Sequence, residues 1–224
     1  MDVINQYLPL YQQAFYLTIR LGFLGIVGAI AAGLVVALIR LYKLPILSPL
    51  FGAYIEVSRN TPLLIQLFFL YFGLPRVRII LSSETCVLIG LTFLGGSYMA
   101  ETFRSVLEAV SNSQKEIGRS IGLKESQILR YIVFPQALSI SLPSISANVI
   151  FLIKETSVFS AVALADLMYV AKDLIGLYYE TDIALWMLVI SYLIILLPTS
   201  LLCHYLERRL RYAEFRDTGT FSRK

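Results

Sequence analysis

The sequence reads Glu116-Ile117-Gly118-Arg119-Ser120-Ile121-Gly122-Leu123 where a charged island interrupts two long apolar regions. Charged side chains are costly in hydrocarbon, so this island and its neighbours Lys115, Lys124, Glu125 and Arg130 are expected to lie in water. Gly122 ends one helical run and a second run begins after it, which predicts a short helix–turn–helix outside the bilayer. Such an element suits the docking of a soluble protein.

The composition of the chain indicates a membrane protein. The 224 residues are 57% hydrophobic and only 15% charged, with a mean hydropathy of +0.72, whereas soluble domains carry about 25% charged residues. The net charge of +4 suits membrane orientation better than nucleic-acid binding, because the basic residues flank apolar segments. Cys86 and Cys203 lie in separate apolar segments, so we expect no disulfide.

Five apolar segments predict an all-α membrane protein, since a spanning helix needs about 20 apolar residues. They cover residues 17–39, 47–74, 86–100, 137–153 and 183–203. Residues 1–13 are polar without a basic start or cleavage site, so we expect them to remain as an extracytoplasmic segment. The transmembrane domain is expected over 14–210, with the exposed loop at about 109–134 and a cytoplasmic tail at 211–224.

Basic residues indicate the orientation in the membrane. With five spans and the N-terminus outside, three basic groups fall on the cytoplasmic side, while the opposite segment, 154–182, is net acidic. Arg76 and Arg78 are an exception. The cytoplasmic groups are Arg40 and Lys43, then Arg104, Lys115, Arg119, Lys124 and Arg130, and finally Arg208, Arg209, Arg211, Arg216, Arg223 and Lys224.

Small residues follow one another along the first span, at Gly22, Gly25, Gly28, Ala29, Ala32 and Gly33. Small side chains let membrane helices approach closely. The stripe is either a dimer face or an intrachain packing face, and we favour intrachain packing.

The second span is interrupted at Asn60-Thr61-Pro62, because proline breaks or kinks a helix. Broken helices occur at membrane depth where protein or a water-filled cavity satisfies the freed backbone, as in transporter binding sites. Polar residues inside spans are functional candidates. The candidate substrate-binding residues are Glu56, Arg59, Asn60, Thr61, Gln66, Ser97, Tyr98, Glu101, Asn148, Lys154, Glu155, Thr156 and Ser157.

Enzyme chemistry has little support in the sequence. A phosphate-binding Gly-x-x-x-x-Gly-Lys motif is missing, so ATP is not expected to bind here. His204 is accompanied by neither a nucleophile elbow nor metal-spaced ligands. We therefore expect a transport subunit without cofactors of its own.

Four fragments resemble the polar amino-acid branch of ABC importer permeases, and the resemblance covers roughly residues 14–210. The charged island through Pro135 is similar to the coupling loop of that family. The other fragments are residues 56–66, 97–104 and 148–157. Two departures are Ile117 and Gly118 where the family has alanines, and Phe134 where leucine is usual.

The resemblance implies a type I fold that carries a polar amino acid by alternating access. It also implies a cytoplasmic ATPase dimer holding ATP and Mg²⁺, a second permease copy or paralogue, and an extracytoplasmic binding protein in a bacterial plasma membrane. The coupling residues would be Glu116, Ile117, Gly118, Arg119, Ile121, Gly122 and Leu123. An ion-gradient-driven secondary transporter is the alternative, although we detect no internal repeat.

The amino and carboxylate groups of an amino-acid substrate require partners of opposite charge. We expect Arg59, with backbone donors near Thr61 and Pro62, to serve the α-carboxylate. Glu101 or Glu155 would serve the α-ammonium or a basic side chain. Alternatively, Glu56 with Arg59 and Lys154 with Glu155 simply neutralise each other.

Overall fold

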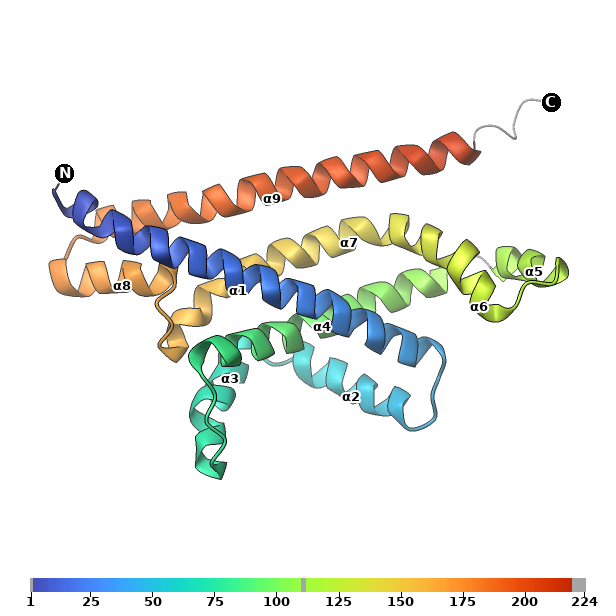
Figure 1. The fold of residues 1–224 in the computed structure, drawn as a ribbon, viewed down its shortest axis with the longest axis horizontal. Coiled ribbons are helices and arrows are strands. Elements are labelled where there is room, and N and C mark those ends of the chain that lie inside the picture. Colours follow the sequence, from blue (N-terminus) through green and yellow to red (C-terminus); the bar gives the residue numbers. More distant parts are fainter. Residues whose placement is uncertain (1, 110–111, 219–224) are drawn as a thin grey trace.

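The computed structural model describes residues 2–109 and 112–218, all of whose regular elements are helical. Figure 1 shows the long helices side by side, with the N-terminus at one end of the molecule and the last helix ending at the other. The elements are α1 (Asp2–Leu41), α2 (Leu47–Arg59), α3 (Leu63–Phe68), η1 (Phe69–Gly73), η2 (Leu74–Val77), α4 (Ser83–Ala109), α5 (Asn112–Ser120), α6 (Glu125–Ile128), η3 (Leu129–Val133), α7 (Phe134–Glu155), η4 (Thr156–Val162), α8 (Leu167–Tyr178) and α9 (Thr181–Thr218).

Four of the described helices are long and apolar enough to span a membrane. They cover Tyr7–Leu41, Ser83–Glu108, Ile140–Val162 and Thr181–Arg209, which correspond to the first, third, fourth and fifth predicted spans. The remaining predicted span, 47–74, consists of α2 followed by the shorter apolar stretch Leu63–Val77. The described residues therefore contain four continuous candidate spans and one candidate span that is broken.

Helix boundaries extend beyond the predicted segments at both ends of the chain. α1 begins at Asp2, so the expected segment 1–13 is helical from its second residue. α9 reaches Thr218, so most of the expected tail, 211–224, continues the last helix, and 219–224 lie outside the described residues. Cys86 is buried and Cys203 is partly buried, and both are free cysteines.

The glycine stripe of α1 packs against α4 of the same chain, as the favoured interpretation predicted. A Cβ atom on Gly25 would come within 2.5 Å of Leu91, and one on Gly28 within 2.6 Å of Thr92. At Gly33 the added atom would lie 2.4 Å from the Met99 Cβ and 2.9 Å from the backbone nitrogen of Ala100. Small residues are therefore required here because the two helix backbones lie almost in contact.

Gly33→Ala is expected to destabilise the protein by about 1–3 kcal/mol, because the new methyl group overpacks a contact with backbone as well as side chain. Thermal unfolding in detergent would measure the change. Gly52→Ala in α2 is the matched control, since its Cβ would meet nothing within 4 Å. The control should stabilise the helix by roughly 0.5–1 kcal/mol. Equal effects from both variants would contradict this account of the α1–α4 contact.

The break in the second span is stabilised by its own polar side chains. The Gln66 side-chain nitrogen donates to the carbonyls of Ser58 (3.1 Å) and Thr61 (2.9 Å). The hydroxyl of Thr61 donates to the Val57 carbonyl at 2.8 Å, and the amide of Asn60 donates to the Glu56 carbonyl at 2.8 Å. Pro62 has no N–H to donate to the Ser58 carbonyl, so the Gln66 amide supplies a partner there, whereas the Glu56 carbonyl also accepts from the Asn60 backbone N–H at 3.1 Å.

A second core joins α8 to the first turns of α1 and to the start of α9 (Figure 1). It contains Tyr7, Leu174 and Leu188, and the Tyr11 hydroxyl donates to the Ala184 carbonyl at 3.1 Å. Asp166, which has no exposed surface, caps α8 by accepting from the Tyr169 backbone N–H at 2.9 Å. Its other carboxylate oxygen, Oδ2, is buried and has no hydrogen-bond partner among the described residues.

Burial raises the pKa of Asp166 to about 6, against the lowering effects of backbone donors and Lys172. The folded protein therefore holds this proton more tightly than the unfolded chain, and stability falls as pH rises from about 4 to 6. The full change corresponds to about 2–3 kcal/mol. Asp166→Asn keeps an N-cap acceptor and should remove this part of the pH dependence of thermal unfolding. An unchanged slope in the variant would show that another group titrates there.

Candidate functional site

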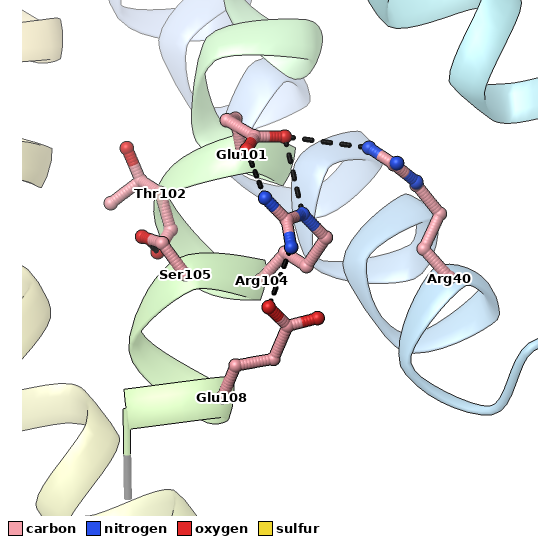
Figure 2. A network of polar contacts seen from close by, with 6 residues as sticks. All are labelled: Arg40, Glu101, Thr102, Arg104, Ser105 and Glu108. Carbon is pink, nitrogen blue, oxygen red and sulfur yellow. Dashed lines mark hydrogen bonds and ion pairs between the residues drawn. The ribbon is translucent and has the colours of Figure 1, made fainter.

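The polar centre of the chain lies on α4, where two arginines hold the carboxylate of Glu101 (Figure 2). Arg104 donates to both Glu101 oxygens, through its NH2 group to Oε1 and through Nε to Oε2 at 3.3 Å. Arg40, at the end of α1, reaches Oε2 at 3.4 Å. Arg104 also binds Glu108 at 2.6 Å. The network joins the last turn of α1 to α4 with paired charges.

Arg59 approaches the same centre from the broken helix. Its guanidinium lies 5.0 Å from the centre of the Tyr98 ring, which is within the range of a cation–π interaction. Arg59 is also close enough to Glu101 to stabilise its negative charge. Tyr98 in turn packs on Phe151 of α7, with ring centres 5.1 Å apart. The structure therefore brings together Arg59, Tyr98 and Glu101, three members of the candidate set.

Asn148 completes this face from α7. Its side-chain amide donates to the Thr102 hydroxyl at 3.0 Å and lies 4.0 Å from the Met99 sulfur. Asn148, Phe151 and Glu155 recur at helical spacing, so they share one side of α7. Three helices thus contribute polar groups to a common centre: α2, α4 and α7.

Other predicted site residues bond mainly to the backbone of their own segment. The buried Ser97 hydroxyl donates to the Leu94 carbonyl at 2.7 Å, and the Thr156 hydroxyl donates to the Ile153 carbonyl at 2.7 Å. Asn60, Thr61 and Gln66 serve the helix break described above. These contacts give each of the five residues a structural role.

The ion pairs of the alternative interpretation, Glu56 with Arg59 and Lys154 with Glu155, are not found among the described residues. Glu56 accepts from the Asn60 amide at 3.3 Å rather than from Arg59. Within the described ranges, neither Arg59 nor Lys154 nor Glu155 takes part in an ion pair. Lys154 is exposed, whereas Glu155 at the end of α7 and Ser157 in η4 are partly buried. In the part of the chain that the structure describes, neither pair is therefore joined by a direct ion pair.

Sequence reasoning omitted Arg40, Thr102 and Arg104 from the candidate site. Arg104 lies three residues after Glu101, a spacing that predicts a contact along a helix, but its charge was attributed to membrane orientation. Arg40 is 61 residues from Glu101 and carried no local signal. The contact between Thr102 and Asn148 depends on the packing of α4 on α7, which the sequence does not specify.

Two grooves border this region on the side of α2. An open groove of about 780 Å³ between α1, α2 and α4 is lined by apolar groups such as Leu50, Val57 and Phe93. A second groove of about 450 Å³ includes Thr61 and Gln66 in its lining. None of the predicted charged residues lies in either lining.

The charged island folds as the predicted helix–turn–helix, with α5 and α6 at the end of the molecule opposite the N-terminus (Figure 1). Residues 110–111, within the predicted loop 109–134, lie outside the described residues. Gly122 has φ +83°, the Leu123 N–H donates to the Gly118 carbonyl at 3.0 Å, and the Gly122 N–H donates to the Arg119 carbonyl at 2.9 Å. This pair of bonds is a Schellman motif, which terminates α5.

Side chains also stabilise the turn between α5 and α6. Arg119 binds Glu125 at 2.6 Å, so its partner lies across the turn rather than at Glu116. This hydrogen bond raises the pKa of Arg119. A Cβ atom on Gly118 would lie 2.9 Å from Ile132, so this glycine allows α5 to approach η3. Ile117 and Ile121 are exposed at 62% and 70%, which leaves an apolar surface on α5.

The described residues contain no group of three or more His, Cys, Asp or Glu side chains that could hold a metal ion. His204 bonds to the Ser200 carbonyl at 2.8 Å, a local contact within α9. Together, the broken helix, the polar centre and the exposed helix–turn–helix define a multi-pass membrane protein of the transport class.

Comparison with known proteins identifies the family. Residues 26–212 match the family described as "Binding-protein-dependent transport system inner membrane component", and the chain belongs to this family. It is therefore a permease component of an ATP-driven importer, and the alternative of a gradient-driven secondary transporter is not supported.

Similar proteins cover almost the whole chain. A probable glutamine ABC transporter permease protein, GlnM of Bacillus subtilis, is 34% identical over 90% of this chain and 93% of its own length. The L-cystine transport system permease protein TcyB of the same organism is 30% identical over 93% of this chain and 90% of its own length. A chain in the solved structure described as "Crystal structure of an amino acid ABC transporter with histidines" shares 29% sequence identity with this chain. The match covers 92% of this chain and 97% of the other, with a TM-score of 0.86. The predicted type I permease fold is thus confirmed.

Proposed function

We propose that this chain forms half of the membrane pathway through which an ABC importer carries a polar amino acid. The observation that carries the proposal is the convergence of Arg59, Tyr98, Glu101 and Asn148 from three helices. The Arg59 guanidinium, which forms no ion pair with any described residue, lies there over the Tyr98 ring, and Tyr98 packs on Phe151 of α7. Arg59 would receive the α-carboxylate and Glu155 the α-ammonium. The amino-acid permeases among the relatives support this substrate class.

The helix–turn–helix would transmit ATPase movement to this centre. α5 follows closely after α4, which carries Tyr98 and Glu101, and its exposed Ile117 and Ile121 offer an apolar surface to a soluble partner. Docking residues would be Glu116 to Leu123. A separate cytoplasmic ATPase dimer would hold ATP and Mg²⁺, and this chain would need no cofactor. A second permease subunit and an extracytoplasmic binding protein would complete the importer.

The same end of the molecule would face the cytoplasm. The α1–α2 turn, α5 with α6, and the end of α9 lie together at the end opposite the N-terminus (Figure 1), and these are the basic segments of the sequence. The Arg20–Glu84 pair and the Arg40–Glu101 pair bracket the middle of α1. The 20-residue separation of the two arginines corresponds to about 30 Å of helix, the thickness of a bilayer core.

The test is the ATPase activity of the chain co-purified with its cytoplasmic ATPase in lipid, with and without the binding protein. Titration with a panel of amino acids should stimulate hydrolysis when a polar amino acid and the binding protein are both present. Activity blind to every amino acid, or failure to capture an ATPase, would overturn the proposal.

A further inference from the structure

The charges around the polar centre restrict which amino acid it accepts. Glu101 was expected to be available for an ammonium group or a basic side chain. Instead, Arg104 binds both of its carboxylate oxygens and Arg40 binds one of them. Bidentate charge-assisted bonds of this kind are the strongest ordinary hydrogen bonds in proteins. A cationic ligand would have to displace an arginine to reach Glu101.

The electrostatic balance of the cluster also opposes a cation. Three guanidinium groups, those of Arg40, Arg59 and Arg104, act on Glu101, while Glu108 is the one further carboxylate that the described residues contribute to the network. The cluster therefore has an excess of one positive charge, which the α-carboxylate of a bound substrate would balance at Arg59, so no negative charge remains there for a cationic side chain. The positive charges of these partly buried arginines are weakly screened by solvent, so they would repel a cationic side chain of the substrate. Arg40, Arg104 and Glu101 have 27%, 25% and 29% of their side chains exposed, respectively.

Few other carboxylates are available to a basic side chain. Glu56 is bonded to the Asn60 amide, and Glu155 is required for the α-ammonium in the proposed function. The remaining groups are neutral hydrogen-bonding partners, the Asn148 amide and the Thr102 hydroxyl, which lie 3.0 Å apart. An amide, ureido or hydroxyl side chain could bond to this pair without needing a counter-charge.

We propose that the polar centre formed by Arg59, Tyr98, Glu101, Thr102 and Asn148 selects amino acids with an uncharged polar side chain and discriminates against arginine and lysine. This inference rests on the proposed function, because it assumes that the substrate occupies this centre. Glu101 then acts through its arginines as a specificity-determining residue.

Direct binding to the permease–ATPase complex in lipid nanodiscs, without the binding protein, would test the proposal. L-citrulline and L-arginine have the same shape and differ in side-chain charge, and L-glutamine and L-lysine provide a second comparison. Citrulline and glutamine should bind at least about tenfold more tightly than arginine and lysine, a difference of about 1.4 kcal/mol. Equal or tighter binding of arginine or lysine would overturn the inference. Failure of all four to bind would overturn the proposed amino-acid site itself.

The contribution of the arginine cluster can be separated from that of the pocket shape. Arg40→Gln removes one positive charge, so the citrulline-to-arginine affinity ratio should fall by at least about threefold. Arg20→Gln is the matched control, since Arg20 lies on the same helix and pairs with Glu84 at a different level. The control ratio should stay unchanged. An unchanged ratio in Arg40→Gln, or an equal fall in both variants, would overturn the electrostatic argument.

Discussion

Gly122→Glu is expected to abolish substrate-stimulated ATP hydrolysis while the chain still inserts into the membrane. Gly122 has φ +83° and closes the Schellman motif between α5 and α6. A side chain in this left-handed conformation costs about 1–2 kcal/mol, which corresponds to a roughly five- to thirtyfold fall in the population of the docking geometry. The added carboxylate also lies in a turn that already contains Glu125. ATPase activity in nanodiscs measures the coupling, and membrane-fraction yield measures the insertion.

Two further variants separate backbone strain from charge. Gly122→Asn should retain most of the coupling, because asparagine tolerates left-handed backbone better than other residues with side chains. Ser126→Glu places the same charge on the exposed face of α6 without strain. Full substrate-stimulated hydrolysis in Gly122→Glu would remove the docking role from this segment. If Ser126→Glu loses substrate-stimulated hydrolysis while Gly122→Asn retains it, the added charge rather than backbone strain disrupts the coupling.

Local residue chemistry was sufficient to predict three features of the fold. The break at Asn60-Thr61-Pro62, the turn at Gly122 and the packing face of Gly25, Gly28 and Gly33 each follow from local chemistry, and each is found in the structure. Proline cannot continue a helix, and a close helix contact leaves no room for a Cβ atom. Constraints of this kind can be recognised from the residue types in the sequence.

The charge partners could not be predicted in the same way. Glu56 and Arg59 have helical spacing, yet Arg59 lies over Tyr98 instead. Arg119 binds Glu125 rather than Glu116, because the turn at Gly122 returns the chain alongside itself. Long charged side chains reach several neighbours, so the choice depends on tertiary packing. The pairing of Arg40 with Glu101 depends wholly on how α1 crosses α4.

Replacing Glu101 with glutamine is expected to reduce amino-acid uptake by at least about tenfold and to destabilise the protein. The carboxylate balances Arg40 and Arg104, and its loss leaves an excess of positive charge in a partly buried site. Removal of one partner from a buried pair costs about 3–5 kcal/mol. Solvent screening at 29% exposure of the Glu101 side chain reduces this to roughly 1–3 kcal/mol. Uptake into proteoliposomes and thermal unfolding measure the two effects.

The matched control is Glu108→Gln, which removes the other carboxylate bound to Arg104. Glu108 is 53% exposed and pairs with Arg104 along one helix turn, so its loss should cost only about 0.3–0.5 kcal/mol. The double variant Glu101→Gln/Arg40→Gln decides how Glu101 acts. If its carboxylate serves to balance the arginines, the double variant regains stability and part of the uptake, giving a favourable coupling energy between the two positions. A stable double variant with no recovery of uptake would instead show that the Glu101 carboxylate contacts the substrate directly.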